Sequence, residues 1–260
     1  MDLDSLFSVE GKTVVVTGGS RGIGLMIAEG MVRSGAKVYI SSRKAEVCEE
    51  QAARLSEFGT CVSLPADLSN AEGVASLARA VSEREDRLDV LVNNAGATWG
   101  APLREFPDSA WDKVMATNVK AVFGLTTALL PHLEAAASPE DPARVINIGS
   151  VDGIRVPDTE NYAYAASKAA VHMVTRQLAH RLTKSHVTVN AIAPGPFPSK
   201  MLAFVLDVEG GEDMIASGVP LGRIGRPDDV VGATLFLSSR AGSYLTGAII
   251  PVDGGISTHG

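Results

Sequence analysis

Short runs of apolar and β-branched residues alternate with longer segments of helical character along this chain. Seven such runs are candidate strands: Thr13–Val16, Lys37–Ile40, Cys61–Leu64, Val90–Val92, Arg144–Ile148, Thr188–Ile192 and Ala248–Val252. Strands separated by helix-length segments indicate right-handed βαβ units, which build a parallel sheet with helices on both faces. The pattern therefore predicts an α/β fold with a doubly wound, seven-stranded parallel sheet.

The size and composition of the chain favour a single domain. The sequence has 260 residues, of which 45% are hydrophobic and 20% charged, which is enough apolar material for one large core. We therefore expect one domain over residues 1–260. The net charge of −7, from 23 basic and 30 acidic residues, argues against nucleic acid as a partner.

Neither a membrane span nor a metal site is indicated. The opening Met-Asp-Leu-Asp-Ser lacks the basic region of a signal peptide, and no stretch approaches the ~20 apolar residues of a membrane helix. Cys48 and Cys61 have no C-x-x-C context, and the histidines show no H-E-x-x-H spacing. We predict a cytoplasmic protein without a membrane partner and without a metal ligand.

A glycine-rich segment, Gly18-Gly19-Ser20-Arg21-Gly22-Ile23-Gly24, follows the first candidate strand and precedes a helical one. Glycines let the backbone approach a phosphate closely, and the unpaired N–H groups at a helix start attract an anion. An ordinary tight turn is the alternative, but the order of strand, glycines and helix favours a dinucleotide pyrophosphate site. Its candidate contacts are Gly18, Ser20, Arg21, Gly22, Ile23 and Gly24.

The end of the second candidate strand bears on the choice of cofactor. In folds that select NAD, an acidic residue about 20 positions beyond the glycines binds the ribose hydroxyls and would repel a 2′-phosphate. Here the strand ends in Ser42-Arg43, and no carboxylate occurs from residue 38 to residue 44. Arg43 offers a fork of donors that suits a phosphate, and Arg21 could approach the same group from the glycine loop. The sequence therefore predicts NADP(H) rather than NAD(H), unless both arginines only face solvent.

A tyrosine and a lysine four residues apart form a candidate acid-base pair. In Tyr164-Ala-Ala-Ser-Lys168, this spacing places phenol and ammonium on one face of a helix. A nearby cation lowers a tyrosine pKa from ~10 by roughly 1–3 units, toward the working pH of an acid-base catalyst. Tyr162 is a rival acid, but Ala166 and not a lysine lies four residues beyond it.

These motifs and their order resemble those of the short-chain dehydrogenase/reductase family. The resemblance rests on the G-x-x-x-G-x-G spacing, on Asn93-Asn94-Ala95-Gly96, and on Asn118, Ser150 and the Tyr164/Lys168 pair, and it runs from about residue 9 to residue 255. It implies a single Rossmann-type domain and an oxidoreductase that interconverts a ketone and a secondary alcohol with NADP(H).

The resemblance also implies a role for each matching residue. Tyr164 would give its proton to the carbonyl oxygen, and Lys168 would lower the tyrosine pKa and hold the nicotinamide ribose. Ser150 would hydrogen-bond the substrate oxygen, although it precedes Tyr164 by one residue more than is usual in the family, and Asn118 would keep a water in the proton relay. Further cofactor contacts are implied for Asp67, Leu68, Asn94, Ala95, Gly96, Pro194, Gly195, Phe197 and Ser199.

Substrate choice in this family resides in the segment after the Pro-Gly turn, here about residues 200–219, which we expect to form a lid. Glycines 210 and 211 predict a break between two lid helices. The apolar residues of this segment could line a pocket for an acyl chain or could be the buried face of the lid: Met201, Leu202, Phe204, Val205, Leu206, Met214 and Ile215.

Within the family, the chain most resembles the NADPH-dependent β-ketoacyl reductases of bacterial rhamnolipid synthesis, through residues 142–151 and 194–199. That likeness implies reduction of a 3-oxoacyl thioester or a similar carbonyl. Two alternatives stay open: a sugar or polyol dehydrogenase of the gluconate type, and a non-catalytic NADP(H) sensor. Family members are commonly tetramers, so we expect a homotetramer or homodimer. The candidate interface is Ala169, Ala170, Val171 and Val174, unless this stripe serves as ordinary core packing.

Overall fold

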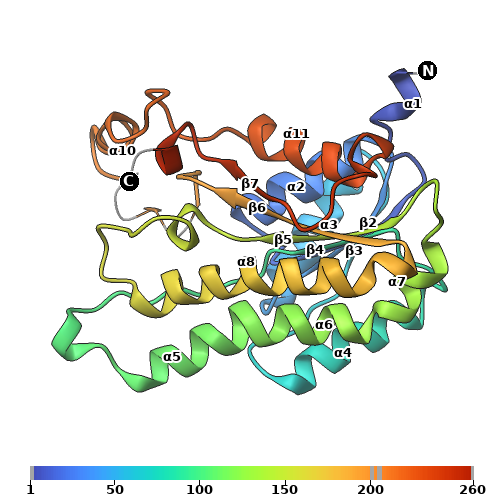
Figure 1. The fold of residues 1–260 in the computed structure, drawn as a ribbon, viewed down its shortest axis with the longest axis horizontal. Helices are drawn as coiled ribbons and strands as arrows, with labels where there is room; N and C mark the ends of the chain where they lie inside the picture. The colour runs from blue at the N-terminus through green and yellow to red at the C-terminus, as the bar shows by residue number, and fades with distance from the viewer. Residues whose placement is uncertain (1–2, 200–201, 204–206, 259–260) are drawn as a thin grey trace.

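A computed structural model describes residues 3–199, 202–203 and 207–258 of the chain, in which seven parallel strands form one sheet. Their order across the sheet is β3-β2-β1-β4-β5-β6-β7 (Figure 1). The bounds are β1 Thr13–Thr17, β2 Lys37–Ser41, β3 Cys61–Ser63, β4 Val90–Asn93, β5 Ala143–Ile148, β6 Val187–Pro194 and β7 Ile249–Val252. The sequence prediction of a doubly wound, seven-stranded parallel sheet is confirmed.

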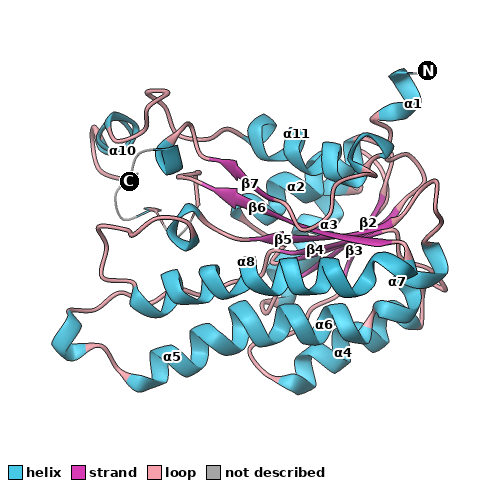
Figure 2. Ribbon diagram, viewed as in Figure 1, coloured by secondary structure: helices cyan, strands magenta, loops and turns pink. Residues whose placement is uncertain are grey.

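Helices cover both faces of this sheet (Figure 2). Side chains of a strand alternate between faces, so Val14 and Val16 of β1 pack against one helix layer and Val15 packs against the other. The first layer contains α2 (Gly22–Arg33), α3 (Ala45–Leu55) and α11 (Pro227–Ser238). The second contains α4 (Ala71–Ser82), α6 (Ala121–Ala128), α7 (Leu130–Ala136) and α8 (Tyr162–Leu182).

In the described part of the chain, two short helices lie outside these two layers, and one further helix packs against α8 and leads into α6. The two short helices are α1 (Leu3–Leu6) and α10 (Gly211–Ser217), and the helix that packs against α8 is α5 (Asp108–Met115). A π-helical turn, η2 (Ala116–Lys120), joins α5 to α6, and a short 3-10 turn, η3 (Val151–Gly153), follows β5. A π-helical turn such as η2 is wider than an ordinary helical turn, and such turns are frequent at functional sites.

The strand order brings distant loops together at one edge of the sheet. Numbering runs downward from β3 to β1 and upward from β4 to β7, so the direction of winding reverses between β1 and β4. In sheets of this kind, ligands bind beyond the carboxyl ends of the strands at that reversal. The segments that follow β1, β4, β5 and β6 therefore meet on the side where the functional site is expected.

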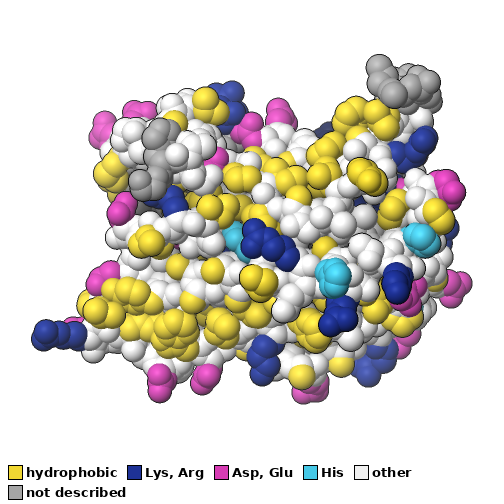
Figure 3. Space-filling view, viewed as in Figure 1, with side chains coloured by type: hydrophobic (Ala, Val, Ile, Leu, Met, Phe, Trp, Pro, Cys, Tyr) yellow, Lys and Arg dark blue, Asp and Glu magenta, His cyan; other side chains and the backbone are white. Residues whose placement is uncertain are grey.

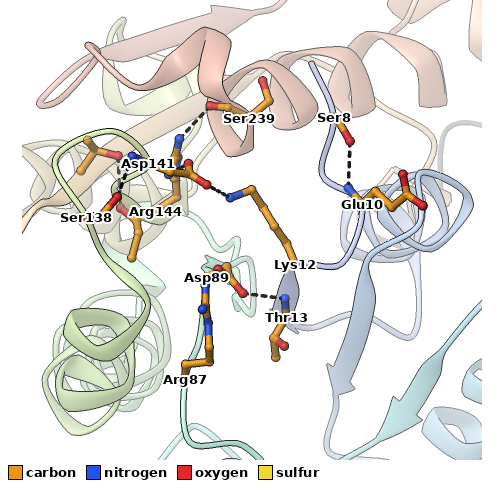
Figure 4. A network of polar contacts seen from close by, with 12 residues as sticks. Ser8, Glu10, Lys12, Thr13, Arg87, Asp89, Ser138, Asp141, Arg144 and Ser239 are labelled. Carbon is orange, nitrogen blue, oxygen red and sulfur yellow. Dashed lines mark hydrogen bonds and ion pairs between the residues drawn. The ribbon is translucent and has the colours of Figure 1, made fainter. Parts of the chain in front are cut away.

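A network of polar contacts joins elements at the opposite edge, where β1 and β5 begin (Figure 4). Lys12 donates to Asp141 at 2.7 Å, and Arg144 forms an ion pair with the other oxygen of Asp141 at 2.7 Å. Arg144 also donates to the backbone oxygen of Ser239 at 2.9 Å. Because the guanidinium of Arg144 is only 1% exposed, Asp141 supplies the negative charge that this buried cation requires.

Among the described residues, no single helix has the length and apolar composition to cross a membrane, although the bent pair Asp108–Ala128 and Leu130–Ala136 passes that test when joined. The same part of the chain contains no group of three or more His, Cys, Asp or Glu side chains that could hold a metal ion. The cytoplasmic location stays a prediction.

Candidate active site

The glycine loop after β1 has the conformation of a phosphate cradle. Gly18 and Gly22 adopt φ of +65° and +53°, a region that side chains rarely enter. A Cβ atom at Gly24 would overlap the backbone oxygen of Gly18 and the amide of Asn94. Helix α2 begins at Gly22, and its N-cap, Arg21, provides no side-chain cap for the first N–H groups. These donors are suited to an anion.

Asn94 fastens this loop to the neighbouring strand. The hydroxyl of Thr17 accepts hydrogen bonds from the backbone N–H groups of Asn94 and Ala95, both at 2.9 Å. The amide of Asn94 donates to the carbonyl oxygens of Thr17 at 2.9 Å and Gly18 at 3.2 Å. Thr17 was missed by the sequence reasoning, although its place directly before the glycines was a usable signal.

The residues predicted to select NADP(H) lie beside the cradle and are open to solvent. Arg21 and Arg43 are exposed, and neither forms an ion pair with another described residue. The hydroxyl of Ser42 donates to the carbonyl of Lys44 at 3.3 Å. Two uncommitted guanidinium groups fit the demands of a 2′-phosphate.

The segment after β3 contributes mainly backbone. Asp67 is exposed, and its carboxylate accepts a hydrogen bond from the N–H of Ser69 at 3.0 Å. The side chain of Leu68 is buried in the core, so only its backbone can face a nucleotide.

The Pro-Gly turn after β6 lies opposite the glycine loop. A Cβ atom at Gly22 would lie 3.4 Å from the Cβ of Ser199, so these two segments face each other. The ring of Phe197 is buried and packs so closely on Gly225 that a side chain at Gly225 would overlap it. Pro194 is the last residue of β6, and the N–H of Gly195 donates to Val252 at 3.0 Å. The turn is therefore anchored on both sides.

The predicted catalytic residues come together where β5 meets α8. The buried Lys168 donates from Nζ to the carbonyl of Ile148, the last residue of β5, at 2.8 Å. Its Nζ lies 5.5 Å from the centroid of the Tyr164 ring. Ser150, two residues after β5, shares a hydrogen bond with the phenol of Tyr164. Tyr164 is half-buried, and Ser150 and Lys168 are buried.

Burial governs the protonation of this pair. Desolvation raises the pKa of Tyr164 to about 12; the hydrogen bond from Ser150 opposes this rise, and the charge of Asp152 adds to it. Desolvation lowers the pKa of Lys168 to about 8, and Asp152 opposes that change. The predicted lowering of the tyrosine pKa by Lys168 is therefore wrong for this structure, because desolvation outweighs the other influences. Tyr164 is a protonated phenol at neutral pH.

Asn118 lies in the π-helical turn η2 and is buried. Its amide donates to the carbonyl of Ala97 and to the hydroxyl of Ser167, both at 2.9 Å, and its oxygen accepts from the N–H of Ala97 at 2.7 Å. A Cβ atom at Gly96 would lie 3.5 Å from the Asn118 oxygen and 3.8 Å from Lys168 Nζ. The loop after β4, Asn118 and Lys168 thus meet; the water-holding role of Asn118 stays a prediction.

Asp152 is a charged neighbour that the sequence reasoning missed. Its backbone N–H donates to the hydroxyl of Ser150 at 3.1 Å, and its carboxylate accepts from the amide of Asn161 at 3.1 Å. Its negative charge raises the pKa values of both Tyr164 and Lys168. The only signal in the sequence was an acidic residue two positions after Ser150.

A family model described as enoyl-(acyl carrier protein) reductase matches residues 18–257, over both the glycine loop and the Tyr164/Lys168 pair. This chain belongs to the short-chain dehydrogenase/reductase family. As a short-chain dehydrogenase/reductase, the protein is an oxidoreductase. The family recognised from the sequence motifs is confirmed.

Two relatives and one solved structure show where this short-chain dehydrogenase/reductase lies within the family. It is 49% identical over 249 residues to the rhamnolipids biosynthesis 3-oxoacyl-[acyl-carrier-protein] reductase of Pseudomonas aeruginosa, covering 96% of this chain and 97% of that one. The solved Pseudomonas aeruginosa RhlG/NADP active-site complex superimposes with a TM-score of 0.95 at 48% identity, covering 97% and 99% of the two chains. Gluconate 5-dehydrogenase of Gluconobacter oxydans is 35% identical over 258 residues, covering 99% of both.

Proposed function

We propose that this protein is an NADP(H)-dependent reductase that converts the ketone of a 3-oxoacyl thioester into a secondary alcohol. One observation carries the chemistry: the protonated phenol of Tyr164 is hydrogen-bonded to Ser150 beside the buried Lys168, at the edge of the sheet that holds the glycine loop. The likeness to the Pseudomonas aeruginosa 3-oxoacyl reductase and to the RhlG/NADP complex supports the cofactor and the substrate class.

The residues around the cradle fit NADP(H). The backbone from Gly18 to Gly24 would hold the pyrophosphate, Arg21 and Arg43 the 2′-phosphate, and the Pro194–Ser199 turn the carboxamide. When bound, NADPH supplies a hydride to the carbonyl carbon of the substrate.

The protein's own groups manage the proton and the charge at the carbonyl oxygen. Tyr164 gives its proton to that oxygen as the ketone becomes an alcohol, and the hydroxyl of Ser150 donates a hydrogen bond to the same atom. The cation of Lys168 stabilises the phenolate left on Tyr164, because the two groups are close neighbours on α8. The bond from Lys168 to Ile148 keeps the ammonium in place during this transfer.

Two loops beside the site favour an apolar acyl chain over a sugar acid. The segments around Leu103 and Val156 are connected by a hydrogen bond from the N–H of Ala101 to the carbonyl of Glu160 at 3.2 Å. Ile154 and Val156, which follow the Ser150 turn, are 45% and 87% exposed, and Leu103 of the second loop is 70% exposed, so both loops offer apolar surface.

The charge of Asp152 supports the same choice of substrate. Its carboxylate raises the pKa values of Tyr164 and Lys168, so its charge reaches the reacting groups. A negative charge at that place disfavours an anionic gluconate-type substrate and does not penalise a neutral 3-oxo thioester.

The test is the initial rate of NADPH oxidation with a short 3-oxoacyl thioester, with NADH as the paired cofactor. We expect turnover with NADPH and much slower turnover with NADH. Arg43→Ser should weaken NADPH binding and leave NADH binding unchanged, because only NADPH carries the 2′-phosphate. Equal use of both cofactors by the wild type would refute the cofactor assignment, and turnover of 5-ketogluconate but not of the thioester would refute the substrate assignment.

The segment 200–219 is proposed as the substrate lid. Gly210 has φ of +73° and is the N-cap of α10, which begins at Gly211 where the sequence predicts a break. Met214 of α10 is 64% exposed and could contact an acyl chain. Lys200, Met201, Phe204, Val205 and Leu206 lie outside the described residues.

A homotetramer or homodimer is proposed as the solution state. Hydrophobic side chains gather over α5 and α8 on the face seen in Figure 3, and Phe123 on α6 and Met173 on α8 are 52% and 53% exposed. Phe123 and Val174 line a groove of about 520 Å³ along α8. Val171 is buried in the core and cannot contribute to that surface, which agrees with the alternative of core packing for this residue. Light scattering showing only monomer at micromolar concentration would refute the oligomer.

A further inference from the structure

His172 is a buried titratable side chain that the proposed chemistry does not use. It lies one turn after Lys168 on α8 and is 5% exposed. Its ring packs against the two glycines that flank the Ser150 turn: a Cβ atom at Gly149 would overlap Nε2, and one at Gly153 would lie 2.9 Å from Cε1. The ring of His172 therefore fits in this place only because Gly149 and Gly153 have no side chains.

Among the described residues, the hydrogen-bond partner of the imidazole belongs to the same turn. The backbone carbonyl of Gly153 accepts a hydrogen bond from the ring. Nε2 has no partner among the described residues, so the bond to Gly153 is made by Nδ1. Burial lowers the pKa of His172 to about 4, so the ring is neutral at physiological pH and its single proton is the one donated to Gly153.

Three successive turns of α8 therefore hold one short segment of chain. Tyr164 shares a hydrogen bond with Ser150, Lys168 donates to Ile148, and His172 holds Gly153. The hydroxyl of Ser150 in turn accepts from the N–H of Asp152, so the position of this hydroxyl depends on the course of the turn η3. The far end of that turn is fixed by His172.

We propose that His172 is a positioning residue that holds the Ser150–Gly153 turn against α8 and thereby sets the hydroxyl of Ser150 against the phenol of Tyr164. This inference rests on the proposed reductase function for its kinetic test, but its structural test is independent of any substrate. His172 acts through the backbone of Gly153 and not by contact with substrate.

The experiment compares His172→Leu, which fills the space without a donor, with His172→Asn, whose amide N–H can take the place of Nδ1–H. His180→Leu is the matched control, because His180 is exposed on the same helix. The readouts are kcat and KM for a 3-oxoacyl thioester and the dissociation constant of NADPH. We expect His172→Leu to lower kcat by about 10- to 100-fold, with NADPH binding changed less than about twofold. His172→Asn should recover most of the lost kcat.

A double variant separates positioning from a general loss of structure. In the Ser150→Ala background, His172→Leu should have little further effect on kcat, because the hydroxyl that it positions is already gone. Losses that multiply in the double variant, or an unchanged kcat in His172→Leu, would overturn the inference.

A crystal structure of His172→Leu gives the substrate-independent readout. The inference requires the Ser150–Gly153 turn to move relative to Tyr164, and an unmoved turn contradicts it. If the wild type fails to reduce the thioester while the turn moves in the variant, the proposed function is refuted and the positioning role stands.

Discussion

Acidification should lower the free energy of unfolding of this protein, because the buried His172 resists protonation in the folded state. A histidine has an ordinary pKa of 6.5, and burial lowers that of His172 to about 4, with the charges of Lys168 and Arg176 acting in the same direction. Between these values the unfolded chain binds a proton that the folded chain does not, so stability is lost as pH falls below 6.5 and toward 4. From pH 7 to pH 5 these two pKa values correspond to a loss of roughly 2 kcal/mol in the free energy of unfolding.

The assay is urea unfolding of the wild type, His172→Asn and His180→Asn at both pH values. All other titrating groups are common to the three proteins and cancel when the losses are compared. His172→Asn should lose about 2 kcal/mol less than the wild type on acidification. His180→Asn, at an exposed position of the same helix, is the control for replacing a histidine on α8. Losses that agree within about 0.5 kcal/mol for the wild type and His172→Asn would refute the reasoning.

Three other substitutions test the rest of the molecule. Tyr164→Phe should lower turnover at least about 100-fold with NADPH binding intact, because the proton donor is lost; near-normal steady-state rates would contradict this. Gly24→Ala should abolish tight NADPH binding, because its Cβ would overlap Gly18 and Asn94; fluorescence titration beside Gly232→Ala, where the Cβ meets open space, checks this. Asp141→Asn should lower the free energy of unfolding by about 3 kcal/mol, because Arg144 stays buried without its anion; urea unfolding beside the exposed Glu140→Gln measures it.

The strands and the glycine loop were predictable because their causes are local. Apolar β-branched runs such as Val14–Val16 form strands wherever both faces of a sheet are covered, and each predicted strand agrees with the structure to within two residues at either end. The conformations of Gly18 and Gly22 follow from a turn that only glycine adopts easily. Resemblance added the partners Ser150 and Asn118, which no spacing rule would have found.

Features that depend on tertiary packing were not predictable. The pKa of Tyr164 rises because the folded chain desolvates its phenol, and a sequence that shows only the neighbouring Lys168 indicates the opposite shift. Asp152 and His172 belong to no motif, and they reach the site only because the turn η3 folds back onto α8. The widened helical turn that carries Asn118 also leaves no mark in the hydrophobic pattern.

One edge of the sheet holds stabilising ion pairs and the other holds the catalytic residues, and this separation affects how the enzyme can be engineered. Lys12 and Arg144 both bind Asp141 where the strands begin, whereas Tyr164 and Ser150 lie beyond the strands' carboxyl ends. Substitutions at distant positions with no shared partner usually have additive effects on stability. Gains in stability engineered at the first edge should therefore offset losses caused by reshaping the second. A library that redirects this reductase to a new ketone could start from a variant stabilised at the first edge. The added free energy of unfolding would compensate for destabilising substitutions at the active site, and the catalytic contacts would stay unchanged.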